Sequence, residues 1–144
     1  FEITIVDARE VIARASNQDL MMLDVFDQQG MPPWLGSDEV LRACRGALSE
    51  NGVLSINVMV EDETALATMM ATVRHVFLGR VLVATAPGYR NIIVFAFRSA
   101  IADTKVSRLG KHATSLERQF DIPLGRIFRN ICGANACRGG HLIV

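Results

Sequence analysis

The sequence predicts an α/β domain whose sheet is doubly wound, mostly parallel, and closed by an antiparallel hairpin. Two observations predict this fold class. Half of the 144 residues are hydrophobic, which suits strands that are buried on both faces. Short apolar runs that suit strands also alternate with amphipathic stretches that suit helices. A chain of this length can form one domain with a substantial core.

The first elements are a strand, a helix and a second strand. Glu2–Val6 is short and rich in β-branched residues, which favours a strand. Ala8–Ala15 has the composition of a helix. Leu20–Phe26 is an apolar run interrupted only by Asp24, which is typical of a central parallel strand that ends near a polar residue.

The middle of the chain repeats this alternation. Ser37 and the acids that follow it predict a helix start, and we expect this helix to end near Asn51-Gly52. Val53–Val60 is the next predicted strand. Ala65–Phe77 carries an apolar stripe at helical spacing, and Gly79 predicts its end.

The last third begins with two predicted strands, Arg80–Ala84 and Asn91–Phe97. The turn residues Pro87-Gly88-Tyr89 between them favour an antiparallel hairpin. Val106–Phe120 then predicts a helix, and Pro123 can open another short one.

Charge is balanced over the whole chain but uneven along it. The net charge is zero, which gives no general reason to expect nucleic acid or a membrane surface as a partner. Residues 1–97 hold twelve acids and seven bases, whereas residues 98–144 hold three acids and eight bases. The basic region is either a solvated helical face or a docking surface for an acidic partner.

The three cysteines, Cys44, Cys132 and Cys137, form no disulfide framework and favour a reducing compartment. Cys132 and Cys137 have His141 close behind but lack a second ligand pair, so we expect no metal site. The stretch Cys132–Gly140 has the composition of a loop. Because the sequence shows no membrane-length apolar run and no signal peptide, we expect a cytoplasmic protein.

Two carboxylates follow the central predicted strand. Asp24 lies near the end of Leu20–Phe26, and Asp27 follows in a loop that contains Gly30. Ligands of open α/β sheets bind beyond the carboxyl ends of the strands. A carboxylate there can hold an ammonium group and accept its proton. The sequence therefore predicts a site for an amine, although Asp24 could be structural and Asp27 could instead stabilise the turn.

Three further residues are candidates for the same crevice. Asn57 lies late in its predicted strand, and the aromatic residues Trp34 and Tyr89 lie in loops or after strand ends. Each has a local alternative, because an asparagine can pair with nearby backbone and a lone aromatic residue can simply pack.

Three stretches resemble, in order and spacing, the spermidine synthase-like branch of the Rossmann-type S-adenosylmethionine-dependent transferases. The three stretches are Ile3–Glu10, Asp19–Asp27 and Leu48–Asn57. The resemblance implies a class I methyltransferase fold that uses S-adenosylmethionine or its decarboxylated form as co-substrate and needs no metal. Residues 1–105 would form a partial domain of this kind, and residues 106–144 its helical extension and tail.

The resemblance also implies residue roles. Asp7 matches the acid that accepts a hydrogen bond from the adenine amino group, and Ala8 allows the base to approach closely. Asp24 matches the acid that orients or deprotonates the attacking amine, and Asp27 matches the second acid that holds a polyamine. Asp7 could alternatively cap the helix that follows it.

One departure from the family concerns the acceptor. Polyamine-making members usually place proline directly after the second acid, whereas here Asp27 is followed by Gln-Gln. The bulkier loop is more similar to spermidine synthase-like proteins of other chemistry and to relatives that methylate amino groups on proteins. Aminopropyl transfer and methyl transfer therefore both remain open, with a small molecule or a protein as the amine.

A second departure concerns the cofactor site. The family places a glycine-rich turn after its first strand, and this sequence contains no such motif. Glu2–Val6 matches the family's third strand, so we expect two strands to lie upstream. Their absence would leave a gap of roughly 14 Å between Glu2–Val6 and Leu20–Phe26, filled by an upstream segment or by another copy of the chain.

Two alternatives remain beside this expectation. Glu2–Val6 could instead pair directly with Leu20–Phe26 in a rearranged sheet. The domain could also be catalytically silent and serve assembly or partner docking through its basic tail. For this chain alone, we expect weak or undetectable nucleotide affinity.

Overall fold

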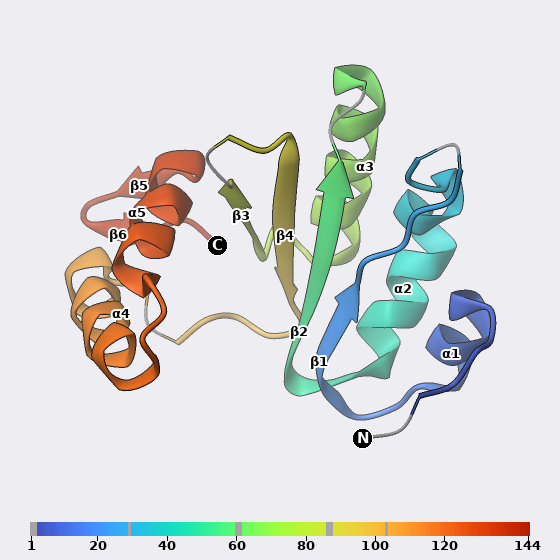
Figure 1. Cartoon of the computed structure of the whole chain (residues 1–144), viewed down its shortest axis with the longest axis horizontal. Helices are drawn as coiled ribbons and strands as arrows, with labels where there is room; N and C mark the ends of the chain where they lie inside the picture. Colours follow the sequence, from blue (N-terminus) through green and yellow to red (C-terminus); the bar gives the residue numbers. More distant parts are fainter. Residues whose placement is uncertain (1–2, 29, 60–61, 86–87, 103) are drawn as a thin grey trace.

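The computed structural model describes residues 3–28, 30–59, 62–85, 88–102 and 104–144, and its main sheet has the strand order β1-β2-β4-β3 (Figure 1). These strands are β1 (Gln18–Leu23), β2 (Leu48–Met59), β3 (Val81–Thr85) and β4 (Asn91–Phe97). β1 runs parallel to β2, whereas β4 is antiparallel to both β2 and β3. The predicted α/β class with a closing hairpin is confirmed, and the described sheet is mixed.

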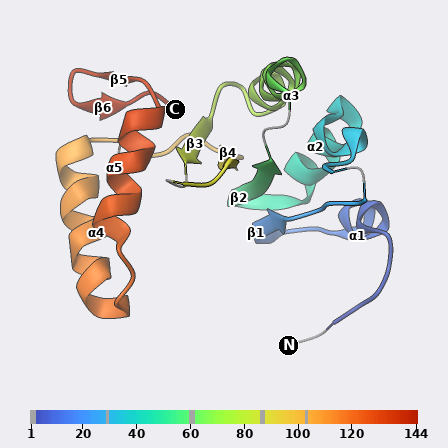
Figure 2. The same cartoon turned by 45° about the horizontal axis from the view of Figure 1, so that its top comes forward.

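The helices form two groups. Their bounds are α1 (Ala8–Arg14), the 3-10 helix η1 (Pro33–Gly36), α2 (Asp38–Ala47), α3 (Glu63–Val76), α4 (Val106–Phe120) and α5 (Leu124–Ala134). α1, α2 and α3 lie beside one another along one face of the sheet (Figures 1 and 2). α4 and α5 pack together near β3, and the short strands β5 (Cys137–Arg138) and β6 (His141–Leu142) follow them.

The core lies between the sheet and the helices α2 and α3. Alternate residues of β2 point into it, so Leu54, Ile56 and Val58 are buried. They pack in one cluster with side chains such as Leu41 of α2 and Phe77 at the end of α3. Burial of each large side chain contributes about 1.5–3 kcal/mol, and this packing fixes where the strands end.

An asparagine side chain joins the C-terminal helices to the sheet. Asn135, directly after α5, accepts a hydrogen bond from the Val83 N–H (2.9 Å) and donates one to the Val83 carbonyl oxygen (2.6 Å). It also donates to the carbonyl of Ile131. The side-chain amide thus satisfies both backbone groups of one β3 residue.

The predicted strand Glu2–Val6 is wrong for its described part. Residues 3–6 form no strand, and Ile5 is 97% exposed. Glu2 lies outside the described residues. A β-branched run needs a partner strand, and no described strand pairs with the outer edge of β1. Direct pairing of this segment with β1 is therefore also wrong.

The boundaries of α2, β2 and β1 differ from the prediction by several residues. α2 ends at Ala47 instead of near Asn51-Gly52, because the fully buried Leu48 pairs with Gln18 and begins β2. β1 ends at Leu23, so Asp24 is the first residue after the strand.

The tail is more ordered than its loop-like composition predicted. Its first residues complete α5, and β5 and β6 form a small hairpin. Gly139 and Gly140 have φ angles of 58° and 78°, which glycine adopts without strain in a tight turn.

Other predicted elements are confirmed. β4 and α4 have the predicted bounds, and α3 differs from its prediction only at its ends. β3 and β4 form the predicted antiparallel hairpin. Pro87, one of the predicted turn residues, lies outside the described residues.

Candidate functional site

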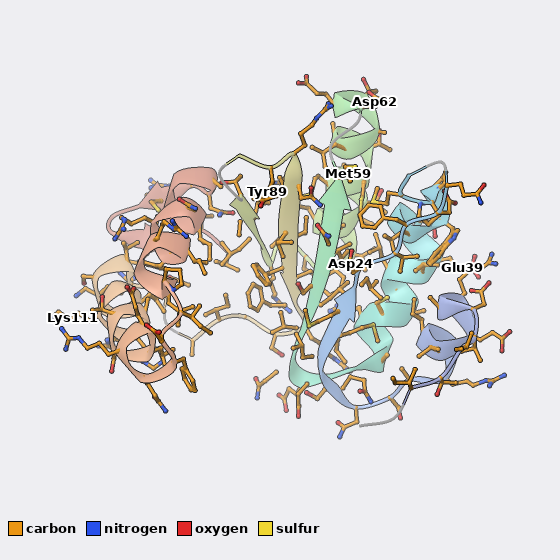
Figure 3. All side chains as sticks on the ribbon, in the orientation of Figure 1. Asp24, Glu39, Met59, Asp62, Tyr89 and Lys111 are labelled. Atoms are coloured by element: carbon orange, nitrogen blue, oxygen red, sulfur yellow. The ribbon has the colours of Figure 1, made fainter. Side chains whose placement is uncertain are left out.

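Three polar side chains from neighbouring strands form a hydrogen-bond chain at the carboxyl end of β1 and β2. Asn57 Nδ2 donates to Asp24 Oδ1 at 2.9 Å, and Asn91 Nδ2 donates to Asn57 Oδ1 at 3.0 Å. In the antiparallel register Asn57 faces Ile93 and Asn91 faces Met59. The two asparagines are therefore diagonal neighbours on one face of the sheet, within reach of each other. Figure 3 shows Asp24 at the end of β1, where the chain leaves the sheet.

This chain orients the Asp24 carboxylate. Because Asn91 donates to the oxygen of the Asn57 amide, the nitrogen of that amide is left facing Asp24. Asp24 Oδ1 is thereby engaged, whereas Oδ2 makes no hydrogen bond within the part of the chain that the structure describes. Asp24 is exposed. The arrangement presents an oriented carboxylate with free acceptor capacity toward the outside of the sheet edge.

Asp27 lies in a tight backbone turn three residues later. Its N–H donates to the Gly30 carbonyl (2.8 Å), and the Gly30 N–H donates back to the Asp27 carbonyl (3.2 Å). Gly30 has a φ of 105°, a conformation that favours glycine. The turn predicted as the structural alternative is present, and the exposed Asp27 side chain follows Asp24 along the same loop.

Asp7 caps α1. Its Oδ1 accepts hydrogen bonds from the Arg9 backbone N–H (2.8 Å) and Nε (3.1 Å), and its Oδ2 accepts from Arg9 Nη2 (2.7 Å). These bonds to Arg9 lower the pKa of Asp7 to about 2. Ala8, half-buried, is the first residue of the helix. No hydrogen bond or ion pair joins Asp7 to Asp24 among the described residues.

The other residues predicted to line the crevice are Asn57, Trp34 and Tyr89. Asn57 is confirmed as a neighbour of Asp24. Trp34 is partly buried against the core, with the Arg9 guanidinium 5.5 Å from its ring centroid. Tyr89 is 76% exposed and lies by the β3–β4 turn (Figure 3).

Asn91 was missed by the sequence reasoning. It lies at the first residue of a strand, and nothing in its local pattern indicates a functional position. Only the register of β4 against β2, which places it opposite Met59, could have paired it with Asn57.

The described residues contain no group of three or more His, Cys, Asp or Glu side chains that could hold a metal ion. Cys44 is buried in the core, and burial raises the pKa of its thiol to about 11. Burial also raises the pKa of Cys132, as does the nearby Cys137. Within the described part of the chain, no helix has both the length and the apolar character needed to cross a membrane.

Known proteins resemble this chain in sequence and in fold. No protein-family model matches the sequence. A polyamine aminopropyltransferase of Neisseria meningitidis serogroup A is 29% identical over 142 residues, which cover 98% of this chain and 54% of the relative. The chain is similar in sequence to polyamine aminopropyltransferases. It spans about half the length of the curated relatives that it matches.

Two solved structures share the fold of this chain. Human methyltransferase-like protein 13 in complex with SAH matches with a TM-score of 0.75 and 22% identity, covering 85% of this chain and 60% of that one. A probable spermidine synthase from Corynebacterium glutamicum matches with a TM-score of 0.63 and 21% identity, covering 96% and 54%. The predicted resemblance and fold are confirmed. The roles of Asp7, Ala8, Asp24 and Asp27 stay predictions.

Proposed function

We propose that the complete protein transfers an aminopropyl or methyl group from a sulfonium donor to an amine, and that Asp24 receives that amine. The donor is decarboxylated S-adenosylmethionine for aminopropyl transfer and S-adenosylmethionine for methyl transfer. Two observations support this function: the sequence relatives are polyamine aminopropyltransferases, and Asp24 is oriented at the carboxyl edge of the sheet. The hydrogen-bond chain from Asn91 through Asn57 to Asp24 carries the proposal.

The chemistry assigned to Asp24 is proton acceptance. The ammonium form of the acceptor donates a hydrogen bond to Oδ2 and then loses a proton to the carboxylate. The freed nitrogen lone pair attacks the carbon next to the sulfonium. A new N–C bond forms, the C–S bond breaks with its electron pair moving to sulfur, and a neutral thioether leaves. The proton passes from Asp24 to solvent.

The other three predicted residues have assigned positions in this scheme. Asp27, on the same loop as Asp24, would hold a second positive charge of a polyamine. Asp7 would accept the adenine amino group, with Ala8 allowing close approach. A carboxylate offers about four acceptor sites, of which Arg9 uses three, so one site on Oδ2 remains for that contact.

The outer edge of β1 is the place where further strands would complete the cofactor site. Leu20 and Met22 of this strand are 55% and 72% exposed. We propose that strands from an upstream segment or from another copy of the chain pair here and bring the glycine-rich turn. On this proposal the described chain supplies the acceptor site and the adenine contacts, and the added strands supply the glycine-rich turn.

The decisive test is product analysis with both donors on the complete protein. Decarboxylated S-adenosylmethionine with putrescine is compared with S-adenosylmethionine and the same amine, and mass spectrometry identifies the transferred group. Asp24→Asn should lower kcat by about 10²–10⁴-fold, because the general base is lost. Asp19→Asn is the matched control. Asp19 lies near the opposite end of β1 from Asp24, where it accepts a hydrogen bond from Ser49 Oγ (2.7 Å). Equal losses in both variants would contradict the assignment.

The alternative is a catalytically silent domain that docks an acidic partner. The exposed basic side chains of α4 and α5 support it, since within the described residues none of the following forms an ion pair: Lys111, Arg118, Arg126, Arg129. Isothermal titration of the complete protein with methylthioadenosine separates the two functions. Binding that weakens in Asp7→Ala favours the transferase, whereas no binding at millimolar ligand favours the silent domain.

A further inference from the structure

A pocket lined by three arginines lies at the amino-terminal end of β2, away from the Asp24 site. Its volume is about 250 Å³, and its walls are Arg42, Arg45 and Gly46 of α2 with Arg98, which directly follows β4. The Arg98 N–H donates to the carbonyl of Gly52, which precedes Asn57 by five residues on β2. At about 3.3 Å of rise per residue, roughly 16 Å of strand separates the two sites. In Figure 1 the connection from α2 into β2 lies at the bottom of the view.

Arg98 is held in place by backbone carbonyls. Its Nη1 donates to the carbonyl oxygens of Leu48 and Gly46, at the end of α2. The last carbonyls of a helix carry partial negative charge, so a guanidinium is stabilised there. The Nε and Nη2 groups of Arg98 make no hydrogen bond within the described part of the chain. Arg98 therefore presents fixed, unused donors at the pocket.

Arg45 supplies an independent observation. Its Nε is buried and, among the described residues, has no hydrogen-bond partner. Buried polar groups without a partner are rare in folded proteins, because the hydration that they lose is not replaced. Because this Nε atom is also inaccessible to solvent, an anion in the pocket would meet Arg45 through its terminal Nη groups.

The charges around the pocket are not balanced. Arg42 is paired with Asp38 through Nε–Oδ2 (2.5 Å) and Nη2–Oδ1 (3.1 Å), and its Nη2 also lies 3.3 Å from His75 Nε2. Glu50, on the nearby part of β2, forms no ion pair with any described residue. Of the three guanidinium groups that line the pocket, those of Arg45 and Arg98 thus have no carboxylate partner among the described residues.

We propose that this arginine pocket binds a small phosphate-bearing anion. Guanidinium groups donate paired, charge-assisted hydrogen bonds to phosphate oxygens, and several arginines around one pocket suit a tetrahedral dianion. The negative charge of a phosphate group would supply the partner that the guanidinium groups of Arg45 and Arg98 lack. Its oxygens can use the free donors of Arg98 and accept hydrogen bonds from the terminal Nη groups of Arg45. The site is separate from the transferase site and does not depend on the proposed reaction.

The test is isothermal titration of the complete protein with inorganic phosphate, pyrophosphate and AMP, with sodium chloride at matched ionic strength as reference. We expect millimolar or tighter binding of at least one phosphate compound, and a rise in Tm with its concentration. AMP binding more tightly than inorganic phosphate would identify a nucleotide as the source, and the reverse order a free phosphate. Arg45→Gln should weaken binding about tenfold or more. Arg126→Gln, at an exposed position of α5, should leave binding unchanged.

Three results would overturn the proposal: no binding of any phosphate compound at millimolar concentration, the same affinity in Arg45→Gln, or an equal effect of chloride. A measurement on the unmutated protein guards against a variant that does not fold. In a ¹⁵N NMR titration the Arg45 Nε–H resonance should move on addition of pyrophosphate. An unmoved resonance beside shifts elsewhere would place any binding at another site and would also refute this one.

Discussion

Replacing Asn57 by aspartate tests the hydrogen-bond chain without any assay of activity. The substitution keeps the shape of the side chain but replaces the Nδ2 donor by an oxygen, 2.9 Å from Asp24 Oδ1. Two carboxylates whose charge centres lie about 4 Å apart repel by about 1 kcal/mol in bulk water and about 4 kcal/mol at an effective dielectric constant of 20. Asp24 is exposed, which favours the lower value.

The lost hydrogen bond adds to this repulsion. A bond to a charged group contributes about 1.5–3 kcal/mol, so Asn57→Asp should lower the free energy of unfolding by about 2–4 kcal/mol at neutral pH. At acid pH the two carboxylates can share a proton, and the folded state then binds protons more tightly than the unfolded state. Stability of the variant must therefore fall as pH rises above about 4, relative to the unmutated protein.

Urea unfolding followed by circular dichroism, at neutral pH and near pH 4, measures both effects. Asn51→Asp is the matched control, because Asn51 is an exposed residue of the same strand and its substitution should change stability by less than about 0.5 kcal/mol. A deficit of the same size at both pH values would refute the reasoning. So would a deficit no larger than that of the control, since Asp24 and Asn57 would then not be in contact.

Three further predictions concern the rest of the fold. The pKa of Asp7 is lowered from 3.8 to about 2, so its ionised form stabilises the fold above pH 4, and this stabilisation is lost as pH falls toward 2. In urea unfolding, the stability of Asp7→Asn should therefore converge with that of the unmutated protein as pH approaches 2. Gly52→Ala places a Cβ 2.6 Å from the Gln18 carbonyl oxygen, so it should lower the free energy of unfolding by about 1–3 kcal/mol, measured by thermal unfolding. Gly46→Ala is the contrasting variant: its Cβ meets nothing within 4 Å, so it should stabilise α2 by about 0.5–1 kcal/mol. Asn135→Ala removes both partners of the Val83 backbone and should accelerate amide hydrogen exchange at Val83, and unchanged exchange there would contradict the role of this side chain.

Regular periodicity explains which elements could be predicted. The apolar stripe of α3 and the alternation of β4 are set by burial against one core, so the sequence pattern reports them directly. The end of α2 could not be predicted from Asn51-Gly52, a normal helix stop, because the long-range pairing of Leu48 with Gln18 decides it. Glu2–Val6 has the propensity of a strand, but propensity alone supplies no partner.

The residues of the candidate site also differ in whether the sequence alone could predict them. Asp24 could be predicted from its position after an apolar run, since the carboxyl edge of a parallel pair is a general binding position. Asn57 could be predicted from the same rule applied to the next strand. Asn91 belongs to an antiparallel strand, so it reaches this edge with its first residue, and only the strand register reveals that.

The amide of Asn135 blocks strand pairing at one edge of the main sheet, whereas no described strand pairs with the other edge, at β1. On β3 it occupies one backbone position where a foreign strand could otherwise begin to pair. Asn135, which blocks this edge, lies in the last quarter of the sequence and follows all four strands of the main sheet. Growth of the sheet, whether during folding or by association of chains, is thereby directed to the opposite border at β1.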